Sequence, residues 1–499
     1  MPAAPEDFRP GWLRFRRQYV IGPRPFALTP DWHIEPLWDG RLLSAHPDLE
    51  RNVYRTGDRQ IVVLGTVFDP ETPDASQAEI VARALESASG PQALVAATYR
   101  WVGRWALLAK WPDAEIGLTD PCGLRQINFA LEPGVLWLGS SPEIVRQVNP
   151  SELDGTSDKV SFYSEDRFRE LESPWLGAET IYSGCRHLAA NHWLDTRTAR
   201  MVRFFPDRPV RSVPVADAVE RATVILQSTL AAAAKRYPLQ LPVTGGWDSR
   251  ILLAASRPFA GTDRIRYFVD RMGVCPPDHA DVRVPQALSQ RLGFALTVEN
   301  SLAPPAWFEA QLRENVTLSR TLPKTNAIYT KLLPGETRMN VNGNVSEICR
   351  CFYQQRMGKL WGEPTVTRML RVMGFAGSQF AGRALEQWLE GLGPQMAGTG
   401  LDVLDMLYWE QRMGNWGAQY PAEQDIAVEE LSPFNGRDII MTLLGTPAVL
   451  RQGPGYPVYA QMAERMWPGI MQEPVNPPEG SIDSAGRVIS EAWRRWLAY

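Results

Sequence analysis

Residues 243–250, V-T-G-G-W-D-S-R, are the most informative segment of this 499-residue chain. A short apolar run, residues 239–243, leads into it, and a helical pattern over residues 250–256 follows it. Two adjacent glycines let the backbone turn tightly and approach a ligand, because neither carries a Cβ atom. Consecutive amides and a helix N-terminus then favour phosphate oxygens. The stretch predicts a nucleotide phosphate loop; the alternative is an ordinary strand–helix turn in which Asp248 caps the helix.

The sequence around this loop alternates between strand and helix patterns. Apolar residues recur at steps of three and four from residue 215 to 236, which predicts a helix. Strands are expected at 265–269 and 296–298, and a helix at 281–292 that Gly293 caps. This alternation predicts a parallel, doubly wound sheet whose ligand lies at the carboxyl ends of its strands. The final 170 residues read as mostly helical.

The first 200 residues show a different sequence pattern, which predicts a β-rich region. Strand-like runs at residues 61–68, 106–109, 116–119 and 135–138 are separated by turn signals such as W-P-D and E-P-G. One helix is expected over residues 77–88. Two prolines near residues 205–209 suit a linker. We therefore expect two domains, residues 1–205 and 206–499.

Charge and hydropathy narrow the class of protein. The net charge is −4 with no block of like charges, which argues against nucleic acid as an obligate partner. No apolar run reaches the roughly 18 residues that a membrane span needs, and the N-terminus lacks the pattern of a signal peptide. We expect a cytoplasmic protein without a membrane partner.

The five cysteines are scattered along the chain, which makes a disulfide framework unexpected. Cys349 and Cys351 form a C-x-C pair, but no second pair or histidine cluster accompanies them, so buried thiols are favoured over a zinc site.

Several motifs together resemble the asparagine synthetase superfamily, which includes β-lactam synthetases and lasso peptide cyclases. Residues 243–250 are similar to its S-G-G-x-D-S pyrophosphate loop, and residues 342–347, N-G-N-V-S-E, stand where the family has a second loop. Further similar segments follow the family's order: G-R-W-A-L-L at 103–108, T-D-P-C-G-L-R at 119–125, L-G-S-S at 138–141, T-I-Y-S-G-C at 180–185 and S-P-F-N-G-R-D at 432–438.

The resemblance implies a fold for each domain. The N-terminal domain would be β-rich and Ntn-hydrolase-like, similar to a class II glutaminase. The C-terminal domain would be a doubly wound parallel-sheet PP-loop ATP pyrophosphatase (adenine nucleotide alpha hydrolase-like), with a helical C-terminal part.

Three positions depart from the family pattern. The family's glutaminase needs a cysteine directly after Met1, but this chain has Pro2 there and no cysteine before Cys122. Asn344 stands where β-lactam synthetase has its Tyr base. The last lysine is Lys359, so the family's C-terminal lysine is absent. The resemblance therefore implies a degenerate glutaminase domain, without ammonia derived from glutamine.

The resemblance implies that the chain would be an AMP-forming, ATP-dependent carbon–nitrogen ligase that uses Mg²⁺. It would adenylate a small-molecule or peptide carboxylate for attack by an amine, in specialised-metabolite or lasso-type peptide biosynthesis, with a precursor peptide or a biosynthetic enzyme as a possible partner. The expected magnesium ligands are Asp248 and Glu347, and the expected catalytic residues are Arg250, Arg350 and Glu410. The expected ATP-binding residues are Leu241, Val243, Thr244, Gly245, Gly246, Asp248, Ser249, Phe268, Val269 and Gly343.

Other interpretations remain open at this point. Glu347 and Glu410 can each be read as solvated carboxylates. The chain can also be read as an ammonia-using asparagine synthetase-like enzyme, or as a non-catalytic nucleotide-binding scaffold.

Overall fold

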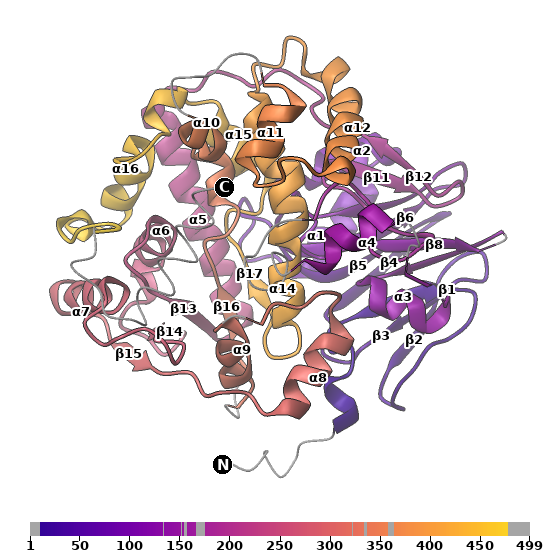
Figure 1. The fold of residues 1–499 in the computed structure, drawn as a ribbon, viewed down its shortest axis with the longest axis horizontal. Helices are drawn as coiled ribbons and strands as arrows, with labels where there is room; N and C mark the ends of the chain where they lie inside the picture. Colours follow the sequence, from indigo (N-terminus) through magenta and orange to yellow (C-terminus); the bar gives the residue numbers. More distant parts are fainter. Residues whose placement is uncertain are drawn as a thin grey trace.

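The structure is a computed structural model that describes residues 10–132, 134–150, 152–153, 157–165, 175–321, 323–333, 337–357 and 364–477. Pro2, Pro133 and Lys359, which the sequence analysis used, lie outside these residues. Figure 1 shows the N-terminal sheets on one side of the molecule and the later helices and parallel strands on the other.

Two six-stranded antiparallel sheets form the first half of the chain, as its β-rich texture predicted. The first sheet has the order β10 (Cys185–His187), β8 (Asn128–Glu132), β9 (Val135–Gly139), β1 (Tyr19–Gly22), β3 (Leu42–Ala45) and β2 (His33–Pro36). The second has the order β12 (Arg200–Arg203), β11 (His192–Asp195), β7 (Glu115–Thr119), β6 (Val102–Lys110), β5 (Arg59–Phe68) and β4 (Arg51–Thr56).

The apolar run of β5 explains how these sheets pack. Val62 and Leu64 face a core shared with the first sheet, whereas Ile61 and Val63 face a second core on the opposite side. Because side chains alternate across a strand, a strand covered on both faces is apolar at every position. The helix α1 (Gln77–Ser87) contributes Ile80 to that outer core.

Helices cover the outer faces of both sheets. The helices α1 and α2 (Pro91–Ala97) lie on the second sheet, and α3 (Pro142–Val148) places Ile144 and Val145 against the first. The N-terminal half therefore has four layers, helix, sheet, sheet and helix.

The second half is built on a five-stranded sheet in which every pair is parallel. Its order is β15 (Leu296–Glu299), β14 (Ile265–Asp270), β13 (Leu239–Pro242), β16 (Met339–Val341) and β17 (Glu430–Leu431). The first strand in the chain, β13, is thus central, with two strands on each side. This agrees with the parallel sheet that the alternating sequence pattern predicted.

The structure describes further helices, most of them after residue 206. They are α4 (Ser157–Ser164), α5 (Val215–Arg236), α6 (Trp247–Ala255), α7 (Ala280–Leu292), α8 (Ala306–Asn315), α9 (Lys324–Leu332), α10 (Phe352–Met357), α11 (Val366–Val372), α12 (Gln379–Met396), α13 (Val403–Met406), the π-helix η6 (Leu407–Gly417), α14 (Ala418–Gln424), α15 (Arg437–Leu444) and α16 (Pro457–Met466). Short 3-10 turns are η1 (Pro10–Leu13), η2 (Thr98–Arg100), η4 (Arg257–Phe259), η5 (Ser346–Cys349), η7 (Ala448–Leu450) and η8 (Ile470–Gln472).

Local signals located the helices next to the phosphate loop well. The helix α5 has the predicted bounds, and Gly293 caps α7 in the left-handed conformation at φ 75°. The helix α6 begins at Trp247, three residues before the prediction, because Gly246 is its N-cap and Asp248 lies in its first turn.

The expected boundary at residue 205 does not separate all packing. The helix α4 comes before this boundary, yet the Phe162 ring lies 5.1 Å from both Phe375 and Phe380. Phe162 therefore belongs to the core of the second half.

Two negative expectations can be compared with the structure. All five cysteines are free and buried, in agreement with structural thiols. In the part of the chain that the structure describes, no helix is long and apolar enough to cross a membrane.

Candidate nucleotide-binding site

The predicted phosphate loop, residues 243–250, lies where the strand order of the parallel sheet reverses. β14 and β16 flank β13 on opposite sides, and all three strands run in the same direction. The segments that follow β13 and β16 therefore leave the same edge of the sheet, and a crevice at such a reversal is where doubly wound sheets bind ligands. The two motifs of the sequence analysis, 243–250 and 342–347, are these two segments.

The loop after β13 is held together by its own hydroxyl groups. The Thr244 amide donates to the Ser249 hydroxyl at 3.1 Å, and the two hydroxyls lie 3.0 Å apart. The Gly246 amide lies 3.3 Å from the Thr244 hydroxyl. These contacts shape the turn, so Thr244 and Ser249 have a structural part besides the phosphate contacts that the sequence predicted.

One loop amide already binds an oxyanion. The Gly245 N–H donates to the Asp281 carboxylate at 2.9 Å, and Asp281 lies in the first turn of α7 with about half of its side chain exposed, 51%. The loop thus presents an amide to a carboxylate oxygen, which is the interaction expected with a phosphate. The sequence analysis did not identify Asp281. Its position in the first turn of a predicted helix could have marked it as an acidic residue at a helix N-terminus. No nearby residue indicated that it would contact Gly245.

The second loop packs tightly on the first. A Cβ atom added to Gly343 would overlap the Cβ of Asp248, so only glycine allows this approach. Val345 has a φ of 80°, which is strained for a β-branched residue and is tolerated only where surrounding structure imposes it. The Ser346 hydroxyl then donates to the Asp248 carboxylate. The two motifs meet through these residues.

A buried arginine joins the two carboxylates that the sequence assigned to a metal. The Arg350 Nη2 lies 2.8 Å from Asp248 Oδ1 and 3.2 Å from Glu347 Oε1. Burial acts to lower the pKa of Arg350, but the charges of Asp248 and Glu347 outweigh it and raise that pKa, so the arginine is a fixed cation. Its side chain is only 8% exposed, against 38% for Asp248 and 32% for Glu347.

Carboxylate oxygens are the ligands that Mg²⁺ prefers, so the donor chemistry of Asp248 and Glu347 is suitable. Their arrangement is not. Each oxygen of the pair already accepts a contact, from Ser346 and Arg350 at Asp248, and from Arg350 and Tyr408 at Glu347. A dication between them would meet the guanidinium charge. As these side chains lie, they do not fit a magnesium ion.

Among the described residues, no three or more His, Cys, Asp or Glu side chains gather in a way that could hold a metal ion. Glu347 is not the solvated carboxylate of the alternative interpretation, since the Tyr408 hydroxyl donates to it.

Arg250 does not point into this site. Its guanidinium is fully buried and donates to three carbonyl oxygens of the later chain, those of Ile470 at 2.9 Å, Glu473 at 2.8 Å and Pro474 at 2.9 Å. The predicted electrostatic role for Arg250 is therefore replaced by a structural one. The same later segment reaches the loop, because the Asn476 amide donates to the Gly245 carbonyl at 2.9 Å.

Glu410 is also a structural residue, neither a free base nor a solvated carboxylate. Both of its oxygens accept from the Arg203 guanidinium, at 2.7 and 2.8 Å, and the Trp388 indole donates to it at 2.7 Å. Burial raises the pKa of Glu410, but the charge of Arg203 outweighs this and holds the pKa below its usual range.

The four apolar side chains among the expected ATP-binding residues are part of the core. Their side chains are at most 2% exposed: Leu241, Val243, Phe268 and Val269. Inner strands of a doubly wound sheet are covered on both faces, so their side chains are already packed. As these residues lie, neither their side chains nor their backbone leaves an exposed surface for a nucleotide base.

Comparisons with known proteins were made at three levels. No family model matches the chain, and no curated protein matches it. Twenty-six chains of solved structures match. One is a glutamine phosphoribosylpyrophosphate amidotransferase from B. subtilis, complexed with ADP and GMP, with 10% identity, 61% of this chain and 88% of that chain covered, and a TM-score of 0.25.

Proposed function

We propose that this chain is an ATP-dependent carbon–nitrogen ligase of the asparagine synthetase-like kind, which releases AMP and pyrophosphate. The observation that carries the proposal is the meeting of two loops at the strand reversal between β13 and β16. A glycine pair with an oxyanion on its amide lies on one side, and a strained, glycine-dependent loop lies on the other. Strain of this kind is typical of functional sites.

In the proposed reaction a substrate carboxylate attacks the α-phosphorus of ATP, which forms an acyl-adenylate and releases pyrophosphate. An amine then attacks the acyl carbon, which gives an amide and AMP. The amides of Gly245 and Gly246 and the N-terminus of α6 are the groups proposed to bind the phosphates. Effective orientation of the two reactants is the main contribution expected from the protein.

The four-layer N-terminal half supports the finer proposal of a degenerate glutaminase-like domain. We propose that the amine comes from the substrate or from a second substrate. A small-molecule or peptide carboxylate, in cytoplasmic natural-product or lasso-type peptide synthesis, is the proposed setting. A precursor peptide or a biosynthetic enzyme is the proposed partner.

A second candidate is a nucleotide-binding scaffold without catalysis. It is favoured by the structural engagement of Arg250 and Glu410, because two of the three expected catalytic residues are occupied elsewhere. An ammonia-using enzyme has no specific observation in its favour.

The substitution Gly343→Ala tests the site without knowledge of the substrate. Its Cβ would collide with Asp248 and separate the two loops. Overpacking typically costs roughly 1–3 kcal/mol, and about 1.4 kcal/mol corresponds to a tenfold change in affinity. We therefore expect the ATP affinity measured by calorimetry to fall by about tenfold or more. Gly391→Ala on α12 is the matched control, because its Cβ meets open space.

The two outcomes have distinct meanings. Unchanged ATP binding by a folded Gly343→Ala protein would mean that the nucleotide does not bind at these two loops. ATP binding that depends on Gly343, without AMP release across carboxylate and amine substrates, would favour the scaffold.

A further inference from the structure

The phosphate loop and the two carboxylates are occupied by charges of the chain itself. The Asp281 carboxylate lies on the Gly245 amide, where the proposed nucleotide would place a phosphate oxygen. Arg350 lies between Asp248 and Glu347, where a metal ion would lie. One side chain mimics the anion and another mimics the cation.

The cation mimic is firmly held. The Arg350 guanidinium lies 5.5 Å from the ring centroid of Tyr456 and 5.7 Å from that of Tyr459, and aromatic faces attract such a cation. The Tyr459 hydroxyl donates to the Ser346 carbonyl at 2.7 Å, which ties this aromatic wall to the second loop. Arg350 therefore has partners on both sides and is shielded from water.

The anion mimic is different, because Asp281 is half exposed. It comes from α7 rather than from the loop, so it can leave the Gly245 amide by a side-chain rotation without disturbing the turn that Thr244 and Ser249 hold. Exposed side chains change rotamer on a picosecond-to-nanosecond timescale. The anion position is thus easily vacated, whereas the cation position is not.

We propose that the free site is self-paired: Asp281 occupies the phosphate position and competes with the nucleotide, and Arg350 occupies the cation position and excludes a divalent metal from Asp248 and Glu347. The inference rests on the proposed nucleotide site. It assigns Asp281 as a residue that lowers nucleotide affinity and Arg350 as a resident cation of the site.

The cation half is tested with Mn²⁺ alone, followed by electron paramagnetic resonance, because Mn²⁺ accepts carboxylate ligands. Wild type should bind Mn²⁺ weakly, and Arg350→Met should bind it about tenfold more tightly or better, since a positive charge is removed from the ligand pair. Arg371→Met, an exposed position on α11, should behave as wild type. If Arg350→Met does not fold, Arg350→Gln replaces it, because the amide side chain is polar but carries no positive charge.

The anion half is tested with ATP in the presence of EDTA, by calorimetry. Asp281→Ala should raise ATP affinity by about tenfold, because a competing like charge is removed. Asp278→Ala removes an exposed carboxylate three residues earlier and should raise ATP affinity less. This control separates direct competition at the Gly245 amide from the long-range effect of removing one negative charge.

The proposal is overturned if neither variant gains affinity, or if wild type binds Mn²⁺ as tightly as Arg350→Met. If no protein binds ATP but Arg350→Met gains Mn²⁺ affinity, the nucleotide function fails while the cation assignment stands. If ATP binds and Asp281→Ala changes nothing, the function stands and the anion assignment fails.

Discussion

Glu410 illustrates how a single buried charge is satisfied in this molecule. Four hydrogen bonds reach its carboxylate, two from Arg203 and one each from Asn191 and Trp388. The ion pair between Arg203 and Glu410 joins the end of strand β12 to the π-helix η6, so it connects the two halves of the chain. Removing one partner of such a pair leaves the other charge buried without compensation.

At the residue scale we therefore expect Glu410→Ala to lower the free energy of unfolding by roughly 3–5 kcal/mol, because Arg203 would remain buried and unpaired. Urea unfolding followed by circular dichroism measures this. Glu390→Ala, an exposed glutamate on α12, should stay within about 0.5 kcal/mol of wild type. Equal effects of the two substitutions would contradict the structural role.

At the scale of elements, Arg250 connects α6 to a segment more than 200 residues later. Its three bonds hold the carbonyls of residues 470–474, and Asn476 then contacts the phosphate loop. Burial lowers the pKa of Arg250 to about 10, so it keeps its charge near neutral pH. Arg250 therefore helps to hold this segment over the loop, together with Arg291, which donates to the Glu473 carboxylate at 2.8 Å.

Arg250→Met should release that segment. We expect amide hydrogen exchange over residues 470–477 to accelerate by on the order of tenfold, because local opening no longer breaks three charged hydrogen bonds. The nearby exposed Arg257→Met serves as the control. Unchanged protection in the Arg250 variant would mean that the segment is held by its apolar contacts instead.

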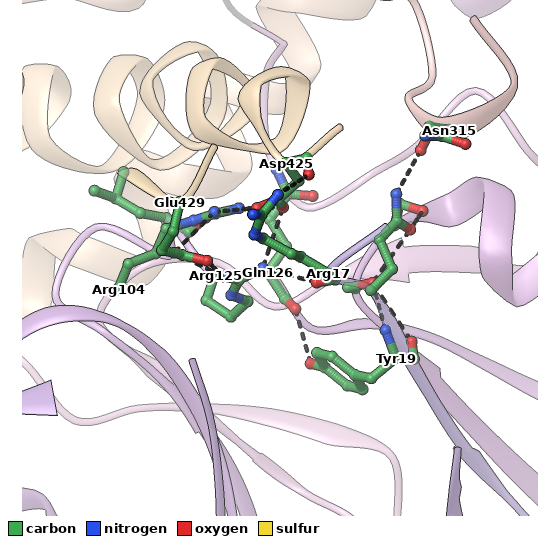
Figure 2. Close-up of polar contacts among 12 residues, drawn as sticks. Arg17, Tyr19, Arg104, Arg125, Gln126, Asn315, Asp425 and Glu429 are labelled. Atoms are coloured by element: carbon green, nitrogen blue, oxygen red, sulfur yellow. Dashed lines mark hydrogen bonds and ion pairs between the residues drawn. The ribbon is translucent and has the colours of Figure 1, made fainter. Parts of the chain in front are cut away.

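At the scale of the whole molecule, a buried ionic network joins the halves (Figure 2). Arg104 binds both oxygens of Asp425, at 2.6 and 2.7 Å, and Arg125 binds both oxygens of Glu429, at 2.8 and 2.7 Å. Arg17 adds a bond to the Asp425 carbonyl at 2.7 Å. The arginines come from the N-terminal half, and Glu429 adjoins the edge strand β17.

This network predicts acid sensitivity. Burial raises the pKa of Glu429, but the charges of Arg125, Arg104 and Arg17 outweigh it and hold the pKa below its usual 4.5. A carboxylate whose folded pKa is depressed contributes stability above its unfolded pKa, and this contribution is lost as the pH falls through the folded pKa.

Glu429→Gln should therefore be less stable than wild type at neutral pH, by roughly 3–5 kcal/mol for a broken buried pair. The difference should shrink as the pH falls below about 4.5. Urea unfolding from neutral pH downward measures it, with the exposed Glu386→Gln as control. A difference that does not change with pH would show that lost packing, not charge, is responsible.

The contacts between the two halves of the molecule explain the role of several residues in the motifs of the N-terminal half. The segments 103–108 and 119–125 supply Arg104 and Arg125, and Asp120 accepts a bond from Asn435 at 2.8 Å. These segments join the two halves.

Local sequence patterns were sufficient to predict the elements around residues 243–250 and their order. Apolar spacing set the bounds of α5, the glycine pair set the turn before α6, and Gly293 ended α7, because each depends on neighbours a few residues away. The alternation of strands and helices was sufficient to predict a parallel sheet.

The roles of the charged residues, in contrast, follow from contacts between distant parts of the chain, which the sequence does not show. Arg250, Arg350 and Glu410 were all expected to be catalytic. Arg250 binds a partner 220 residues away and Glu410 one 207 residues away, and these contacts make both residues structural. Arg350 binds Asp248, 102 residues away, and so lies at the candidate site. Asp281 reached Gly245 across 36 residues. A long side chain can extend in many directions, and its partner is fixed only when distant elements pack, so no local pattern carries that information.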